Sequence, residues 1–585
     1  MFRKTSPQTS MFEAQFVVSP EKAARLAKSW AEPFRVRVLP LVDEEALRDA
    51  FHADNGRPNT SIRLLVALHI LRDWHDMTDA GVVEQLEYNL QWQYALGVEP
   101  ASAHVSERTL WSFRQLLKES ERARKMFEGI TRGLAEGDGL SLGRQRLDST
   151  HVVPNIAILT RLGLFVETVA AFLTALRAEI PKAFATVGAG YVKRYLEREG
   201  YFSDAKRSQV PRRLIAVAQD VLALHDQFAA DAAVSVLPAF VTLRRLLFEQ
   251  CEVVEVDPEG DGEAPGGGDA DGGDDGPPEG ERRIRTRQAN LREAKEIGSD
   301  SLQTPHDTDA TYGHKGKGYE VQLAETCNPE NPYQAITGVA VNGAHESDQN
   351  ALVPMLEQLD AAKMAPTEII ADTGYGSGAN IVAAAARGVE LIAPVQDPDA
   401  PVLADPMAVS VANAPAAQGG VTSAPAASSI DLGDFAFDTT CEEVLYCPGG
   451  VTPKDQHMAG GQLYARFSAA NCTGCPLAAL CPTRELSDGD RLLRQSPASI
   501  ATELRQVEQQ QEPFKDRYSI RSGIESTNSE IKNYHGLGDL RIRGAPQVTL
   551  AAILKALALN VKRAVQYHVG LMLAPPALPG AAATC

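Results

Sequence analysis

The sequence lacks a long uninterrupted apolar run and an apolar leader. Its best apolar segments carry a charge, Glu167 in LGLFVETVAAFLTAL and Lys555 in TLAAILKALALNV, whereas a membrane-spanning helix needs about 20 consecutive apolar residues. The first residues, MFRKTSPQTSMFEAQF, contain no apolar core of the kind that directs secretion. We therefore expect a cytoplasmic protein without membrane spans.

Cysteine is scarce and unevenly placed. Of eight cysteines, five lie between Cys441 and Cys481 with the spacing C-x5-C-x24-C-x2-C-x5-C. In a reducing compartment such a cluster suggests a metal before disulfides, although this spacing is not that of a standard two-knuckle zinc ribbon. Two interpretations stay open: reduced cysteines in a small apolar lobe, or a structural zinc ion on Cys447, Cys472, Cys475 and Cys481, with Cys441 or His457 as substitute ligands.

Basic residues are also few. The chain has 57 Lys and Arg against 76 Asp and Glu, a net charge of −19, which argues at first against nucleic acid because DNA binding depends on neutralising phosphates. Residues 252–281 hold twelve of the acids and no base, so the rest of the chain carries about −7. This Gly-, Pro- and acid-rich segment has no apolar anchors and is predicted to be a disordered linker. A basic stripe elsewhere is still compatible with the composition.

The pattern of apolar residues divides the chain into helical and mixed parts. Amphipathic helical segments fill residues 12–135, which suit either a helix-turn-helix DNA reader or a helical bundle with no DNA role. Strands and helices alternate after the linker, which predicts a mixed α/β sheet of five strands when RQRLDSTHVV (144–153) is included. The remaining expected units are a first strand in 140–155, a helical insertion over 156–251, the mixed α/β core over 300–396, a loop and cysteine-rich insertion over 397–510, and helices over 514–566.

One segment near the C-terminus gathers opposite charges on one helix face. If YSIRSGIESTNSEIKNYHG is a helix, then Tyr518, Arg521, Glu525 and Lys532 fall within about 60° of one another. A separate apolar stripe, suited to packing on a sheet, consists of Ile520, Ile524 and Ile531. Taken alone, the charged face is as expected for a solvated helix with Arg–Glu pairing.

Two further acids are placed where sheets build sites. Asp148 lies within the first predicted strand, and Asp372 ends a later strand just before the turn TGYGSG. Either one alone suits a turn-forming Asp. Three carboxylates brought together would repel one another and would persist as neighbours only around cations. Two hard ions about 3.5–4 Å apart would then activate water and stabilise the leaving oxygen of a phosphodiester.

Taken together, these residues resemble the DDE transposases of bacterial insertion sequences. The order strand-Asp148, strand-Asp372, helix-Glu525 carries the resemblance, and the helix has the pattern Y-x2-R-x3-E-x6-K. The helical start, from GRPNTSIRLLVALHIL through SERTLWSFRQLL, resembles the N-terminal domain of these enzymes. The other matching segments are RLDSTHV, DATYGHKGKGYEVQLAET (309–326), NGAHESDQNALVPMLEQL (342–359), IIADTGYGS (369–377) and LRIRGAPQVTLAAILKALALNVKR (540–563).

The resemblance implies a fold, a metal site and DNA contacts. The fold class is α+β or mixed: a helical N-terminal domain, then a ribonuclease-H-like mixed α/β catalytic domain with helical and cysteine-rich insertions. Asp148, Asp372 and Glu525 would be catalytic and would hold two Mg²⁺ or Mn²⁺ ions. The DNA strand would be positioned by Tyr518, Arg521 and Lys532, with further phosphate contacts from Lys315, Lys317, Arg541 and Arg543. Since the family tends to be basic and this chain is acidic, its DNA path should be a confined stripe.

The activity implied is cleavage of double-stranded DNA at terminal inverted repeats and strand transfer into target DNA. The protein would act as a homodimer in a synaptic complex, in the bacterial cytoplasm and at the nucleoid when bound to DNA, with no membrane partner. An alternative is a catalytically silent DNA-binding protein of transposase descent, for which the loss of one acid would be diagnostic; all three acids are present. A ribonuclease-H-like nuclease acting on other nucleic acid is disfavoured by the Tyr-Arg-Lys face.

Overall fold

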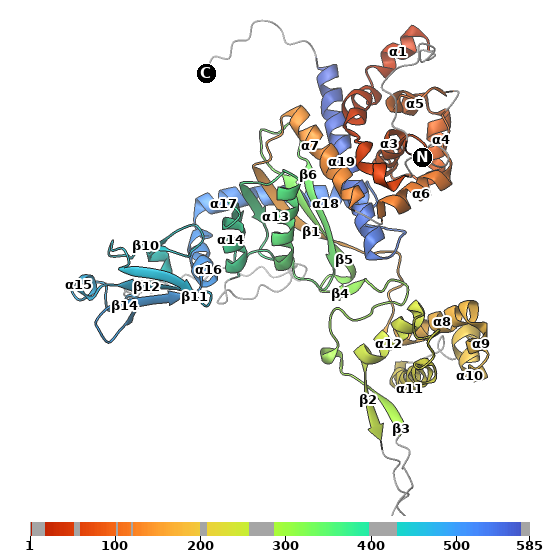
Figure 1. Cartoon of the computed structure of the whole chain (residues 1–585). Coiled ribbons are helices and arrows are strands. Elements are labelled where there is room, and N and C mark those ends of the chain that lie inside the picture. Colours follow the sequence, from red (N-terminus) through yellow and green to blue (C-terminus); the bar gives the residue numbers. More distant parts are fainter. Residues whose placement is uncertain are drawn as a thin grey trace, which may run out of the picture.

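The computed structural model describes residues 2, 18–51, 59–100, 103–118, 121–198, 207–256, 286–396 and 430–574. Figure 1 shows a central sheet and its helices, a group of helices from the N-terminal part beside them, and two lobes that project from this body. Within the described residues, the helices are all too short or too polar to cross a membrane.

The N-terminal part is entirely helical, as the periodicity predicts. Capping explains several helix starts: the Thr78 side chain accepts the backbone N–H of Gly81, and Asn89 caps the next helix in the same way. The elements are α1 (Pro20–Leu26), α2 (Ala31–Pro33), η1 (Phe34–Val38), η2 (Leu39–Leu41), η3 (Glu45–Ala50), α3 (Ile62–Trp74), α4 (Asp79–Tyr88), α5 (Leu90–Leu96), α6 (Glu107–Lys118) and α7 (Arg122–Asp138). The elements from α2 onward share one apolar core with the long C-terminal helix α19 (Ala545–Leu573), which runs alongside them in Figure 1.

The central sheet has six strands and mixed direction, which confirms the predicted mixed α/β class. Its strands are β1 (Arg144–Val152), β4 (Thr311–Gly313), β5 (Gly316–Thr326), β6 (Ile336–Gly343), β7 (Glu368–Ala371) and β8 (Glu390–Ile392). Strand β1 pairs antiparallel with β5 and parallel with β7, while β6 extends the sheet beyond β5 and β8 extends it beyond β7. The five predicted strands are present; the sixth, β4, has only three residues, too few to give an alternating pattern.

Helices cover both faces of this sheet. Ile369 and Ile370 of β7 point to opposite faces, as neighbours on a strand must. Ile369 packs in a core with η8 (Asp348–Ala351) and α13 (Leu352–Ala361), whereas Ile370 packs against Phe514 of α17 (Glu512–Ser519). The chain continues from α17 through the 3-10 turn η11 (Ile520–Ser522) into α18 (Gly523–Asn533). The predicted single helix around Glu525 is therefore two helices joined by a tighter turn.

The first lobe is a helical insertion with its own core. It consists of α8 (Arg161–Glu179), α9 (Pro181–Phe184), α10 (Ala189–Tyr191), η5 (Val192–Glu197), η6 (Arg207–Gln209), α11 (Val210–Phe228) and α12 (Pro238–Gln250). A two-stranded ribbon, β2 (Cys251–Val256) with β3 (Thr286–Leu291), follows and leads to η7 (Ala294–Glu296). The predicted linker thus begins later than expected, because residues 252–256 pair with β3; residues 257–285 lie outside the described residues.

The second lobe contains the cysteine cluster. A four-stranded sheet in the order β11-β12-β14-β13 forms its centre, and α16 joins it to α14 of the main body. Residues 397–429, predicted as loop, lie outside the described residues. The elements are α14 (Gly378–Ala385), η10 (Leu432–Asp434), β9 (Ala436–Phe437), β10 (Val444–Tyr446), β11 (Asp455–Ala459), β12 (Gln462–Phe467), α15 (Ala469–Cys472), β13 (Arg484–Glu485), β14 (Arg491–Gln495) and α16 (Pro497–Glu508).

Candidate active site

The three predicted acids lie around Arg521, beside the middle of strand β1. In the parallel pairing of β1 with β7, Leu147 lies opposite Ala371, so the next residues, Asp148 and Asp372, sit side by side where the paired segment ends. Glu525 comes from the first turn of α18. The structure therefore brings together residues that are separated by more than 370 positions in sequence.

Arg521 is the centre of this arrangement. Its Nη2 lies 3.3 Å from Asp148 Oδ1 and 3.8 Å from Asp372 Oδ2, and its Nη1 lies 3.2 Å from Glu525 Oε1. A guanidinium presents several N–H donors in one plane, which lets one side chain face several carboxylates. Arg521 thus offsets the repulsion that three neighbouring carboxylates would otherwise exert on one another.

The three carboxylates differ in exposure. Asp148 is 6% exposed, while 65% of the Glu525 side chain is exposed. Burial, with a smaller contribution from the charge of Asp372, raises the pKa of Asp148 although Arg521 opposes the shift. Asp372 also accepts the backbone N–H of Gly374 at 2.8 Å, which fixes the turn after β7. The site thus combines a buried carboxylate, a partly exposed one at Asp372 and an exposed one at Glu525.

Two polar residues that the sequence pattern did not single out support Asp148. Asn528 Nδ2 donates to Asp148 Oδ2 at 3.0 Å from one turn after Glu525 on α18. Asp348 accepts the hydroxyl of Ser149, the neighbour of Asp148, at 3.1 Å. The charge pattern of the helix face overlooked Asn528 because the residue is neutral; its position three residues after Glu525 is the signal that could have found it.

Lys315 and Lys532 contact residues of β1 that follow Asp148, and both are bonded within the protein. Lys532 Nζ donates to the backbone oxygen of His151 at 3.0 Å, and Lys315 Nζ lies 3.3 Å from Ser149 Oγ and 3.4 Å from Glu320 Oε2. Tyr518 belongs to α17, where its ring stacks on Phe514. These three side chains border the site without touching Asp148.

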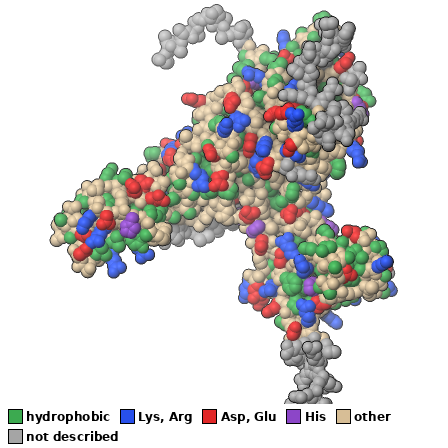
Figure 2. Space-filling model, viewed as in Figure 1, with side chains coloured by type: hydrophobic (Ala, Val, Ile, Leu, Met, Phe, Trp, Pro, Cys, Tyr) green, Lys and Arg blue, Asp and Glu red, His purple; other side chains and the backbone are tan. Residues whose placement is uncertain are grey.

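The other predicted DNA contacts are Lys317, Arg541 and Arg543. Lys317 donates to the backbone oxygen of Leu159, and burial lowers its pKa. Arg543 donates to the backbone oxygen of Asn155, and Arg541 lines a cavity between α3, α6 and the start of α19. On the face seen in Figure 2, basic and acidic side chains of the described residues are interspersed, and these residues form no extended basic surface there.

The donors around Asp148 suit a hard cation. Carboxylate and amide oxygens are the ligands that Mg²⁺ and Mn²⁺ prefer, and the amide oxygen of Asn528 is buried with no hydrogen-bond partner. Among the described residues, however, no group of three or more His, Cys, Asp or Glu side chains stands close enough together to hold a metal ion. The acids converge on Arg521 and not on a common point.

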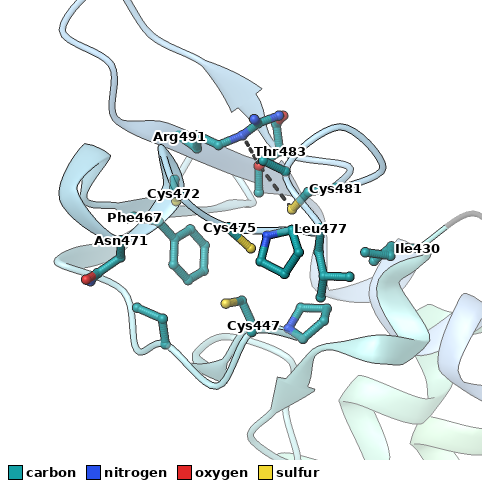
Figure 3. Close-up of a pocket in the computed structure, with 16 residues that line it drawn as sticks. Ile430, Cys447, Phe467, Asn471, Cys472, Cys475, Leu477, Cys481, Thr483 and Arg491 are labelled. Atoms are coloured by element: carbon teal, nitrogen blue, oxygen red, sulfur yellow. Dashed lines mark hydrogen bonds between the residues drawn. The ribbon is translucent and has the colours of Figure 1, made fainter.

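The four cysteines predicted to bind zinc surround one pocket of about 350 Å³ in the second lobe. Figure 3 shows Cys447, Cys472, Cys475 and Cys481 around it, together with apolar side chains including Phe467 and Leu477. All four are free thiols, and Cys481 accepts a hydrogen bond from Thr483 at 3.2 Å. Because the part of the chain that is described contains no metal-binding group, the zinc site gains no support from the geometry.

Comparisons with known proteins add two domain assignments. Residues 446–565 match the family model of a transposase DDE domain, and residues 26–116 match that of a transposase domain (DUF772). The first match contains Tyr518, Arg521, Glu525 and Lys532, whereas Asp148 and Asp372 lie outside both. The uncharacterized protein ORF8 in the nfe locus of Rhizobium meliloti is 32% identical over 124 residues, 19% of this chain and 56% of that protein. No solved structure gives a significant match.

Proposed function

Since this chain belongs to the DDE transposases of insertion sequences, we propose that it cuts double-stranded DNA at the ends of a mobile element and joins the freed ends to target DNA. The observation that carries this proposal is the meeting of Asp148, Asp372 and Glu525 on Arg521. The sheet supports a ribonuclease-H-like core, because its central strand β1 has antiparallel neighbours on one side and parallel strands on the other.

We propose that Asp148, Asp372 and Glu525 hold two Mg²⁺ or Mn²⁺ ions. Bound there, the ions would activate the attacking water or hydroxyl and stabilise the leaving oxygen of the phosphodiester. The hard oxygen donors and the unpartnered amide oxygen of Asn528 fit such ions. The protein's part is to hold three carboxylates from two strands and one helix within reach of the same phosphate.

The basic residues bordering the acids would hold the DNA strand. Arg521 is placed to exchange a carboxylate for a phosphate, since its planar donors suit both. Lys532 and Lys315 lie next to β1, where they donate to the oxygens of His151 and Ser149. Each could exchange this hydrogen bond for one to a phosphate. We propose Tyr518, Lys317, Arg541 and Arg543 as further DNA contacts, and the helices of residues 12–135 as a DNA-binding domain. A homodimer would bring two DNA ends together.

Purified protein should be tested on DNA that carries the sequence flanking its own gene, with Mg²⁺, with Mn²⁺ and with EDTA. We expect metal-dependent nicks at one defined boundary, lost in Glu525→Gln. Glu530→Gln is the matched control on the same helix, because Glu530 pairs with Lys562 and Arg563 away from the acids. Boundary-specific binding without cleavage in every variant would favour the alternative, a catalytically silent DNA-binding protein of transposase descent.

A further inference from the structure

Asn528 links the helix that carries Glu525 to the strand that carries Asp148. Its Nδ2 donates to Asp148 Oδ2 at 3.0 Å, and the residue is 9% exposed. Arg521 Nη2 lies 3.3 Å from the other oxygen, Oδ1. Both oxygens of Asp148 are thus held by donors from the segment around Glu525, so the direction of this carboxylate depends on how that segment is seated.

The amide of Asn528 is only half used. Its Oδ1 is buried and has no hydrogen-bond partner, and a buried unpaired polar atom costs about 1–3 kcal/mol. The preceding residue differs: the Thr527 hydroxyl donates to Glu325 at 2.6 Å and accepts from Arg563 at 2.8 Å. The bond to Asp148 accounts for the Nδ2 of Asn528, whereas no contact among the described residues accounts for its Oδ1.

A neutral donor has a specific advantage at this position. A second cation, in addition to Arg521, would neutralise Asp148 further, and an aspartate would repel it. An amide N–H fixes the direction of the carboxylate and adds no charge of its own. Hydrogen-bond partners of metal-ligating carboxylates act in this way, and their loss costs roughly 10–100-fold in metal affinity or activity.

We propose that Asn528 is a positioning residue of the carboxylate site, which aims Asp148 at the cations shared with Asp372 and Glu525. This inference rests on the proposed function and adds a fourth residue to it. Asn528 holds Asp148 through a hydrogen bond, while Glu525, one turn earlier on the same helix, is itself one of the three acids. The helix therefore sets the positions of two of the three acids at once.

The test uses the full chain with Asn528→Leu and Asn528→Asp, and with Asn533→Leu as the matched control. Asn533 is on the same helix, is exposed, and donates only to Ser529 of that helix among the described contacts. Three quantities are measured: the thermal midpoint, Mn²⁺ affinity by calorimetry without DNA, and the single-turnover cleavage rate at saturating DNA.

Both Asn528 variants should fold, bind Mn²⁺ roughly 10–100-fold more weakly, and cut more slowly with an unchanged affinity for DNA. Raising the Mn²⁺ concentration should restore part of the rate. Asn533→Leu should match the unmodified protein in all three quantities. If Asn528→Leu or Asn528→Asp folds, binds Mn²⁺ and cuts as the unmodified protein does, or if both variants unfold, the positioning role is overturned. Failure of the unmodified protein to bind Mn²⁺ or cut DNA would instead overturn the proposed function itself.

Discussion

Arg521 Nη2 lies 3.3 Å from Oδ1 of Asp148, and this contact joins the segment before α18 to the central strand of the sheet. The same guanidinium reaches Glu525 at 3.2 Å. Because an ammonium is a point charge on a flexible stem, lysine cannot face several carboxylates in one plane. The contact therefore leads to a prediction about the most conservative change at this position.

Arg521→Lys should lower the single-turnover cleavage rate about 100-fold, the scale expected when reacting groups are displaced by about 1 Å. Arg517→Lys is the matched control: Arg517 bridges Glu368 and Glu390, the first residues of β7 and β8, at 2.8 Å, whereas Asp372 follows the last residue of β7. That variant should cut at close to the unmodified rate. Equal rates for Arg521→Lys and Arg517→Lys would contradict the central place given to Arg521.

Neutralising Glu325 should lower the free energy of unfolding more than neutralising any other single carboxylate. It is fully buried on β5 and accepts from Arg146 at 2.8 Å, from Arg563 at 2.6 Å and from Thr527 at 2.6 Å. Glu325→Gln leaves Arg146 without its counterion and Arg563 with Glu530 alone, and breaking a buried ion pair in this way costs about 3–5 kcal/mol. Denaturant unfolding followed by circular dichroism measures this loss. Glu330→Gln, at an exposed position, is the control, and an equal stability of the two variants would refute the prediction.

The N-terminal helices should lose stability in mild acid because of His69. Burial lowers the pKa of this histidine to about 4, with a further contribution from Arg114, against about 6.5 in an unfolded chain. Between these two values the unfolded state binds the extra proton. The free energy of unfolding therefore falls as pH drops from about 6.5 to about 4, by on the order of 3 kcal/mol, and is insensitive to this group above pH 6.5.

Tryptophan fluorescence measures this effect selectively, since all four tryptophans lie in the N-terminal part, at positions 30, 74, 92 and 111. Denaturant unfolding of the unmodified protein and of His69→Leu should be compared at pH 7 and pH 5. The pH dependence should be weaker in the variant. An equal change in both proteins would show that His69 is not the group that titrates.

The cysteines should differ sharply in reactivity. Burial raises the pKa of the Cys251 thiol to about 11 and that of Cys327 to about 12, whereas Cys447, Cys475 and Cys481 are only half-buried around the pocket. Since the thiolate is the reactive form, iodoacetamide at pH 8 should label the pocket cysteines well before Cys251 and Cys327. Peptide mass mapping checks the order. Labelling of the pocket that begins only after a chelator is added would indicate a bound metal instead.

The local pattern of apolar residues predicts most strands and helices of the core. It does not predict which of them pair or pack together. The strand at Asp148 follows from RQRLDSTHVV, yet its pairing with β5 joins residues such as His151 and Glu320 across the whole helical insertion. The single helix expected at 518–536 is interrupted by the 3-10 turn η11, which Arg146 of β1 contacts. Its guanidinium donates to the Ile520 carbonyl at 3.0 Å, and a Cβ on Gly523 would lie 2.0 Å from it. A local sequence pattern cannot predict a contact between residues so far apart in the sequence.

In the candidate site, too, the sequence predicts some residues and only the structure shows the others. Its charged members were found because the family resemblance concerns charged residues in a fixed order. Asn528 and Asp348 were missed, since their importance arises only from a hydrogen bond to Asp148 and to its neighbour Ser149. Several predicted DNA contacts also have partners within the protein, which a sequence cannot show: Lys532 binds the His151 carbonyl, and Arg543 binds that of Asn155.

In the proposed mechanism, Asp148, Asp372 and Glu525 act as one unit. The most direct test is the single-turnover cleavage rate of Asp148→Asn, Asp372→Asn, Glu525→Gln and the triple variant, on DNA that all four still bind. Residues that act as a unit have strongly non-additive effects, so each single change should abolish nearly as much cleavage as the triple change. Small losses that multiply to the triple loss, or full activity in any single variant, would contradict the account.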